Sequence, residues 1–259
     1  MVNIILEGPN TAMPSEALQY WNYNLPAGQR TAQCPDFLLN LSDKDRRLIG
    51  SWDSDYEVQD WATVQELVKT NRIDLFQRVP TELRRYREFI FNIVRDYGSV
   101  MKFVLRTRLH WDSIVSAGNP FEDASDVKIL YNDWPYGVDP RIVHLVVWTK
   151  FDLEDDPELD DLTPAARQSI EDYVDATFKA HMRDPNHVVW FKNWRSLKSV
   201  HAVEHFHVML FKPDLKFVEE ITCRDVPLSV KLKNEKLESE KAIDFGEKKV
   251  QENGYGSEL

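Results

Sequence analysis

Two histidines, His205 and His207, are separated by one residue in a segment, Val203–Phe211, that has the apolar and aromatic composition of a strand. Side chains alternate between the two faces of a strand, so both imidazoles should point to the same face. A third histidine, His144, lies in a second predicted strand. Imidazoles held side by side can act as nucleophile and orienting partner, as acid and base, or as metal ligands. The alternative is a structural pair that backbone carbonyl groups satisfy.

The elements that must position these histidines are strands and one helix. Val127–Asn132 and Ile142–Thr149 are short apolar runs separated by the turn signal Trp-Pro-Tyr-Gly, and His187–Phe191 has the same strand composition. Thr163 and Pro164 are typical of a helix start, with Thr as the N-cap and Pro at the first helical position. We therefore expect a small, mainly antiparallel sheet crossed by one long helix.

The first half of the chain carries helical signals. Apolar residues recur at helical spacing over about 60–76, 81–97 and 99–109. Thr81 and Ser99 are the expected N-caps of the second and third helices, and Gly98 is the expected C-terminal glycine of the second.

The expected fold class is α+β. A helical N-terminal half, 51–115, packs on a sheet-containing half, 120–218, and the two form a single domain over 51–230. Residues 1–50 contain four prolines and are predicted to form an extended arm. Residues 231–259 are mixed in charge and poor in apolar side chains, which predicts a disordered tail.

Composition excludes several classes of protein. The chain has 32 basic and 43 acidic residues, a net charge of −11, so it lacks the basic footprint that a nucleic-acid or anionic-membrane binder needs. No stretch approaches the roughly 18 apolar residues of a membrane span. Its two cysteines, Cys34 and Cys223, are far apart, which argues against a disulfide scaffold or a cysteine zinc site. We expect a cytoplasmic protein.

The order of these elements is similar to the layout of the histidine-triad nucleotide hydrolase and transferase superfamily. The matching pieces are Asn132-Asp133-Trp134-Pro135, the strand from His144 to Lys150, Asn193, Ser199-Val200 and His205-Phe206-His207. This resemblance implies that a histidine of the last strand attacks an α-phosphate while nearby Asn and Ser groups hold phosphate oxygens. The pattern departs from the superfamily at Met209, where a third polar residue is expected, and no glycine lies between Asn193 and Ser199.

A second resemblance covers more of the chain, from about residue 18 to residue 218. Trp21–Pro26, Arg30–Pro35, Leu130–Gly137, Trp190–Trp194 and Glu204–Val208 resemble segments of a fungal family named for N-acetylglucosamine-induced protein 1. The resemblance implies a cytoplasmic fungal protein linked to the amino-sugar response and to chitin supply. It implies no mechanism, so no residue role follows from it.

Two classes of function remain open. One is a ligand-binding or partner-binding factor of the amino-sugar response; the other is a divergent hydrolase or transferase acting on a nucleotide or nucleotide-sugar phosphate. The candidate catalytic residues are His205 and His207, and the candidate ligand-binding residues are Asn193, Ser199, His144 and Trp134. Trp134 can equally be a core residue. The expected ligand is a nucleotide or an amino-sugar phosphate, and the sequence indicates no cofactor, no metal site and no particular protein partner.

Overall fold

The computed structural model describes residues 18–156, 161–193 and 203–238. Its centre is a four-stranded sheet of β1 (Val127–Tyr131), β2 (Ile142–Thr149), β6 (Glu204–Phe211) and β5 (Val188–Phe191), in that spatial order. All neighbouring strands are antiparallel. The register places Val146 opposite His207 and His144 opposite Met209, which brings all three histidine positions to the centre of the sheet. The predicted α+β class and antiparallel sheet are confirmed.

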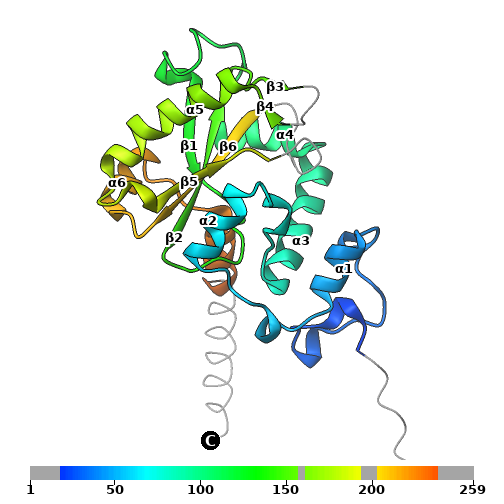
Figure 1. Ribbon diagram of the computed structural model, residues 1–259. Coiled ribbons are helices and arrows are strands. Elements are labelled where there is room, and N and C mark those ends of the chain that lie inside the picture. Colours follow the sequence, from blue (N-terminus) through cyan, green and yellow to red (C-terminus); the bar gives the residue numbers. More distant parts are fainter. Residues whose placement is uncertain (1–17, 157–160, 194–202, 239–259) are drawn as a thin grey trace, which may run out of the picture.

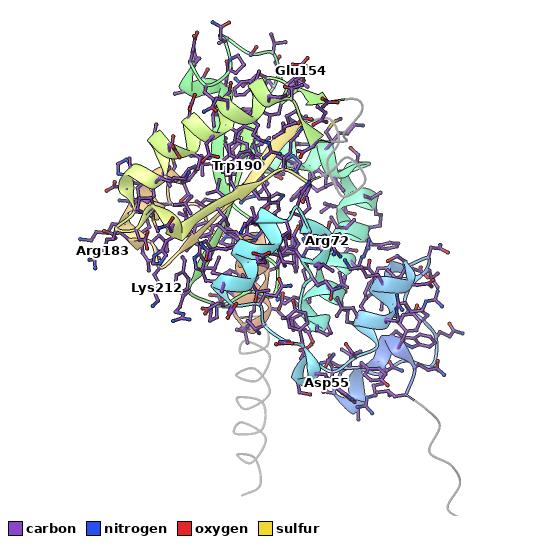
Figure 2. All side chains as sticks on the ribbon, viewed as in Figure 1. Asp55, Arg72, Glu154, Arg183, Trp190 and Lys212 are labelled. Carbon is purple, nitrogen blue, oxygen red and sulfur yellow. The ribbon has the colours of Figure 1, made fainter. Side chains whose placement is uncertain are left out.

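One face of the sheet is covered by α5 (Pro164–Thr177), the predicted crossing helix (Figure 1). Ile170 and Val174 of α5 pack on alternate residues of the two central strands, and this main core comprises Leu145, Val147, Phe206, Val208 and Leu210 from those strands. Trp190 lies near α5 in Figure 2 and donates its indole N–H to Glu171 Oε2 at 2.6 Å. The apolar residues that alternate along β2 and β6 thus point to the face covered by α5 and form the core there.

The opposite face carries the histidines and is covered by helices from the first half of the chain (Figure 1). These are α2 (Trp61–Lys69), α3 (Pro80–Tyr97) and α4 (Val100–Phe103), followed by a π-helical segment, Val104–Leu109. Trp61 and Val64 of α2 pack with Met209 of β6, while α3 and α4 pack near Leu130 of β1. The predicted third helix therefore exists, but its second half has π geometry.

The predicted helix ends are mostly confirmed. Gly98 ends α3 with a φ of 80°, Ser99 accepts a hydrogen bond from Lys102 N, and Thr163 caps α5 through Ala166 N. Thr81 is not an N-cap, because α3 begins one residue earlier at Pro80. Proline supplies no N–H, and the backbone N–H of Thr81 instead donates to the carboxylate of Asp53 at 2.9 Å.

The helix predicted over 60–76 is shorter than expected. It ends at Lys69, and Asn71 adopts a left-handed φ of 53°, a conformation that asparagine tolerates better than most residues. A short 3₁₀ turn, Ile73–Leu75, follows.

The two terminal regions correct the sequence predictions. The arm predicted to be extended over 1–50 contains α1 (Asp43–Ile49), whose first turn is capped by Ser42; residues 1–17 lie outside the described ranges. The tail predicted to be disordered from 231 is helical over 228–238, and 239–259 lie outside the described ranges. A further helix, α6 (Leu215–Ile221), was not predicted. Between β2 and α5, β3 (Asp155–Asp156) and β4 (Asp161–Leu162) pair in an antiparallel manner. Within the described residues, none of the helices combines the length and apolar character needed to span a bilayer.

Three arginines of α3, Arg84, Arg85 and Arg87, connect both terminal regions to this helix. Arg84 donates to the carbonyl of Trp21 at 2.5 Å, and Arg87 forms an ion pair with Asp45 of α1. Arg85 bonds to Glu82 and to the carbonyl of Ser229 at 2.9 Å, so it reaches the last described helix. Because these guanidinium groups have partners inside the protein, we interpret the three arginines as structural residues that hold the terminal regions against α3.

Candidate functional site

A cavity of about 150 Å³ lies between the histidine-bearing face of the sheet and helices α3 and α4. Its walls combine apolar side chains from both helices with polar groups from the strands and from the Asn-Asp-Trp-Pro-Tyr-Gly turn. The polar and aromatic lining residues that could contact a ligand are Arg78, Tyr136, Asn132, Trp134, Trp148, Asn193, His205 and His207. Groups from segments far apart in the sequence thus converge on one partly open cavity.

His207 is held at both of its ring nitrogens. Nδ1 lies 2.9 Å from Nε2 of His144 on β2, and Nε2 lies 3.1 Å from Nδ2 of Asn193. The ring also stacks on Phe191 at 4.9 Å between centroids, with an interplanar angle of 12°. His207 is therefore fixed in orientation, and both of its hydrogen-bonding positions are occupied by protein groups.

Burial keeps the coupled imidazoles neutral. It lowers the pKa of His144 to about 3, with a smaller contribution from the charge of Arg78. Burial is also the main cause that lowers the pKa of His207 well below 6.5, assisted by His144, His205 and Arg78. A buried cation without a counter-charge is costly, so at physiological pH both rings are neutral donors and acceptors.

His205 differs from His207 in what its ring contacts. Nδ1 lies 2.9 Å from the carbonyl oxygen of Val203, and the indole of Trp148 stacks on the ring at 4.5 Å. A carbonyl can only accept, so Nδ1 carries the proton, and in a neutral ring the lone pair then resides on Nε2. A neutral His205 therefore has the tautomer with its lone pair on Nε2, and both ring nitrogens of His207 bond to protein groups.

The third polar position that is missing from β6 is supplied by β2. Met209 is fully buried among apolar residues that include Trp61 and Val64 of α2, and His144 is its cross-strand partner. His144 is 4% exposed and reaches His207 rather than the cavity. The chain thus forms a three-histidine group in which one imidazole comes from the adjacent strand.

The turn between β1 and β2 shapes one wall of the cavity. Asn132 accepts a hydrogen bond from Trp134 N at 3.0 Å, and its Nδ2 lies 3.2 Å from Nε2 of His144. A Cβ on Gly137 would lie 2.5 Å from the ring of Tyr56, so only glycine allows this approach. The Tyr56 hydroxyl lies 3.0 Å from the Gln77 carbonyl oxygen and 3.2 Å from that of Gly137, which connects the turn to the segment before α3.

A buried charge network supports the same turn. Arg108, in the π-helical segment, bonds to Asp133 at 2.9 Å and to both oxygens of Asp225 at 2.9 and 2.7 Å. Asp133 also accepts from the backbone N–H of Leu228 at 2.9 Å. The network therefore joins the turn to the start of the helix over 228–238.

Arg78 is a cavity residue that the sequence analysis missed. Its Nε donates to the carbonyl oxygen of Trp134 at 2.9 Å, and its guanidinium lies 4.1 Å from the ring centroid of Tyr86 and 5.3 Å from that of Tyr136. Across 18–156, 161–193 and 203–238 it forms no ion pair. A single arginine before a helix start has no motif, and only the fold places it beside the histidines.

The structure brings most of the predicted site residues together. His205, His207, Asn193 and Trp134 line the cavity, and His144 contacts it through His207. Ser199 lies outside the described residues. Trp134 is 4% exposed, so it is a core residue that also forms a cavity wall. In the described part of the chain, no group of three or more His, Cys, Asp or Glu residues is arranged to hold a metal ion.

Two curated proteins and one solved structure are similar to this chain. It is 30% identical over 181 residues to N-acetylglucosamine-induced protein 1 of Candida albicans, covering 62% of this chain and 71% of the relative. It is 26% identical over 166 residues to an uncharacterized protein of Saccharomyces cerevisiae, covering 62% and 82% of the two chains. The crystal structure of HTC1 superposes with a TM-score of 0.51 and 25% identity, covering 64% of this chain and 96% of that one.

The family model described as Protein of unknown function (DUF3605) matches residues 60–211. The match runs from α2 to the end of β6, so it includes the sheet, the histidines, Arg78 and the Asn-Asp-Trp-Pro-Tyr-Gly turn. This segment is more than half of the chain, and it agrees with the similarity to the Candida albicans protein. The chain belongs to the DUF3605 family.

Proposed function

We propose that this protein acts in the cytoplasmic response to N-acetylglucosamine by binding a small ligand in the cavity between the sheet and α3. The similarity to N-acetylglucosamine-induced protein 1 supports the response, and a role in amino-sugar or chitin metabolism follows from it as part of the proposal. The proposed ligand is a nucleotide or an amino-sugar phosphate. The net charge of −11 makes nucleic acid and anionic membranes unsuitable partners.

The observation that carries the proposal is the convergence of polar groups on one cavity. Two imidazoles, two side-chain amides, the guanidinium groups of Arg78 and Arg108 and the carboxylate of Asp133 line a cavity of about 150 Å³. Packed cores avoid such a lining, because polar groups taken from water need hydrogen-bond partners. Binding pockets combine apolar walls with a few placed polar groups, and this cavity has that composition. A cavity of this size encloses a group about as large as benzene, so a larger ligand would extend beyond it.

A thermal-shift series tests the proposal. N-acetylglucosamine 6-phosphate, UDP-N-acetylglucosamine and AMP are each added to the folded protein, together with unphosphorylated N-acetylglucosamine. A ligand present at 100 times its dissociation constant should stabilise the native state by about 2.7 kcal/mol and raise the Tm. Asn193→Ala, which removes a cavity amide, should reduce the shift, whereas Asn186→Ala at an exposed position should not. The absence of a Tm shift with every compound would contradict the proposal.

A second candidate function is phosphoryl or nucleotidyl transfer through His205. The contact of Nδ1 with the Val203 carbonyl oxygen favours it, because the lone pair of a neutral ring then resides on Nε2. The lone pair on Nε2 would attack phosphorus, a P–N bond would form as the P–O bond to the leaving group breaks, and water would later hydrolyse the adduct. The leaving oxygen would take a proton from solvent, and the hydrolysing water would restore the neutral imidazole. His207 does not suit this role, because both of its nitrogens bond to protein groups.

Trapping the adduct tests this second candidate. Wild type and His205→Asn are incubated with a fluorescent AMP conjugate for a single turnover, and the protein is examined by mass spectrometry. Catalysis predicts a covalent adduct on His205 and a loss of hydrolysis by orders of magnitude in the variant. His187→Asn, at a half-buried position outside the cavity, is the matched control and should retain both. Hydrolysis unchanged in His205→Asn would exclude this residue as the nucleophile.

A further inference from the structure

Arg78 is a cation that the described protein leaves without a counter-charge. One edge of its guanidinium is used, because Nε donates to the carbonyl oxygen of Trp134. The rings of Tyr86 and Tyr136 hold the group by cation–π contacts, and the Nη atoms have no hydrogen-bond partner among the described residues. By contrast, the other cavity arginine, Arg108, is fully paired with Asp133 and Asp225.

A second group at the same wall lacks a partner. The indole Nε1 of Trp134 is buried and has no hydrogen-bond acceptor among the described residues, although the side chain is only 4% exposed. A buried donor left unsatisfied is costly, so such positions in native proteins often serve a ligand or water. Trp134 and Arg78 both line the cavity, and Arg78 Nε donates to the main-chain carbonyl oxygen of Trp134, so the two residues contribute to one site.

We propose that Arg78 and Trp134 form an oxyanion site, in which the two Nη atoms of Arg78 bind a phosphate monoester in a bidentate manner and Trp134 Nε1 donates to the same ligand. The proposal rests on the proposed function and specifies the group that occupies the cavity. Guanidinium matches tetrahedral and planar oxyanions in this bidentate geometry. The imidazole of His205 and the amide of Asn193 line the remaining space, and the carboxylate of Asp133, which also lines the cavity, is paired with Arg108.

The size of the cavity separates the charged group from the rest of the ligand. A space of about 150 Å³ encloses a phosphate group but not a whole nucleotide. The binding energy should therefore reside mainly in the phosphate, and the uncharged part should contribute less. An amino-sugar phosphate and a mononucleotide share this chemistry, so they have to be compared directly.

Calorimetric titration at low ionic strength tests the oxyanion site. The probes are N-acetylglucosamine 6-phosphate, AMP, inorganic phosphate and neutral N-acetylglucosamine. Wild type should bind the phosphorylated probes, with N-acetylglucosamine at least tenfold weaker. Arg78→Gln should weaken the phosphorylated probes about ten- to a hundredfold and leave the neutral sugar unchanged, because a charge-assisted bond is lost. Arg78→Lys keeps the charge without the bidentate fork and should be intermediate.

Two controls keep the outcome decisive. Arg72→Gln removes an exposed guanidinium that pairs with Asp74, and it should leave all affinities unchanged (Figure 2 labels Arg72). Far-ultraviolet circular dichroism and the Tm establish that each Arg78 variant is folded; if Arg78→Gln is unfolded, Arg78→Lys alone decides. The proposed oxyanion site is wrong if neutral N-acetylglucosamine binds as tightly as its phosphate, or if a folded Arg78 variant keeps wild-type affinity for the phosphorylated probes. In either case the proposed ligand-binding function stands. If no probe binds wild type, both are wrong.

Discussion

Replacing Trp134 with alanine should lower the free energy of unfolding by about 3–5 kcal/mol, the usual cost of truncating a buried large aromatic side chain. The indole packs against Phe89 at 5.3 Å and Tyr86 at 6.0 Å between ring centroids, and Arg85 lies 5.4 Å from its ring. These contacts fix the turn between β1 and β2 against α3. The substitution should also abolish ligand binding, because the cavity would lose one wall.

Urea unfolding followed by fluorescence and circular dichroism measures this loss. Trp52→Ala is the matched control, since Trp52 is 41% exposed and its removal should cost far less. A near-wild-type midpoint for Trp134→Ala, combined with lost ligand binding, would show that the indole contributes to the binding wall and not to the core.

Replacing Arg108 with methionine should destabilise the protein by about 3–5 kcal/mol, because two acidic side chains lose their shared cation in a buried setting. Arg108 and Asp225 have side chains that are 7% and 5% exposed, and Asp133 is 22% exposed. Burial already raises the pKa of Asp133, and the charge of Arg108 opposes this rise. Without Arg108, the pKa of Asp133 should rise further, so the loss of stability should be smaller at acidic pH.

The matched control for this substitution is Arg141→Met. Arg141 pairs with Asp139 at the surface and is 56% exposed, so its removal should change stability by at most about 1 kcal/mol. The double variant Arg108→Met with Asp225→Asn should recover part of the loss, because one unpaired carboxylate is removed. Equal effects of Arg108→Met and Arg141→Met in thermal unfolding would contradict the structural role given to the network.

The sheet, and the placement of His205 and His207 on one face of β6, could be predicted because successive side chains of a strand alternate between its two faces. The prediction that His205 and His207 share a face is confirmed, and so are the strands around them, within one residue at each end. The predicted crossing helix is also confirmed, since Thr163 and Pro164 are a local start signal that tertiary contacts did not override.

The rest of the site depends on register and long-range packing, which local patterns do not encode. His144 lies opposite Met209 because of the pairing between β2 and β6. The spacing of residues along the chain does not encode this pairing, so the contact between His144 and His207 could not be predicted from sequence. Arg78 lies two residues before Pro80, where α3 begins. Its guanidinium contacts the ring of Tyr86, which lies further along α3, and this contact accompanies its position at the cavity. The helix over 228–238 was missed because its anchoring partners, Asp133 and Arg85, are far away in sequence.

The central claim is that the cavity binds a ligand beside His205 and His207, and its most direct test is a nitrogen-15 NMR titration of the histidine rings. N-acetylglucosamine 6-phosphate should shift the ring resonances of His205 and His207 in a saturable manner. His181 and His187, which do not line the cavity, should stay unchanged and serve as internal controls. Ring resonances of His205 and His207 that do not move, or that move no more than those of His181 and His187, would contradict the claim.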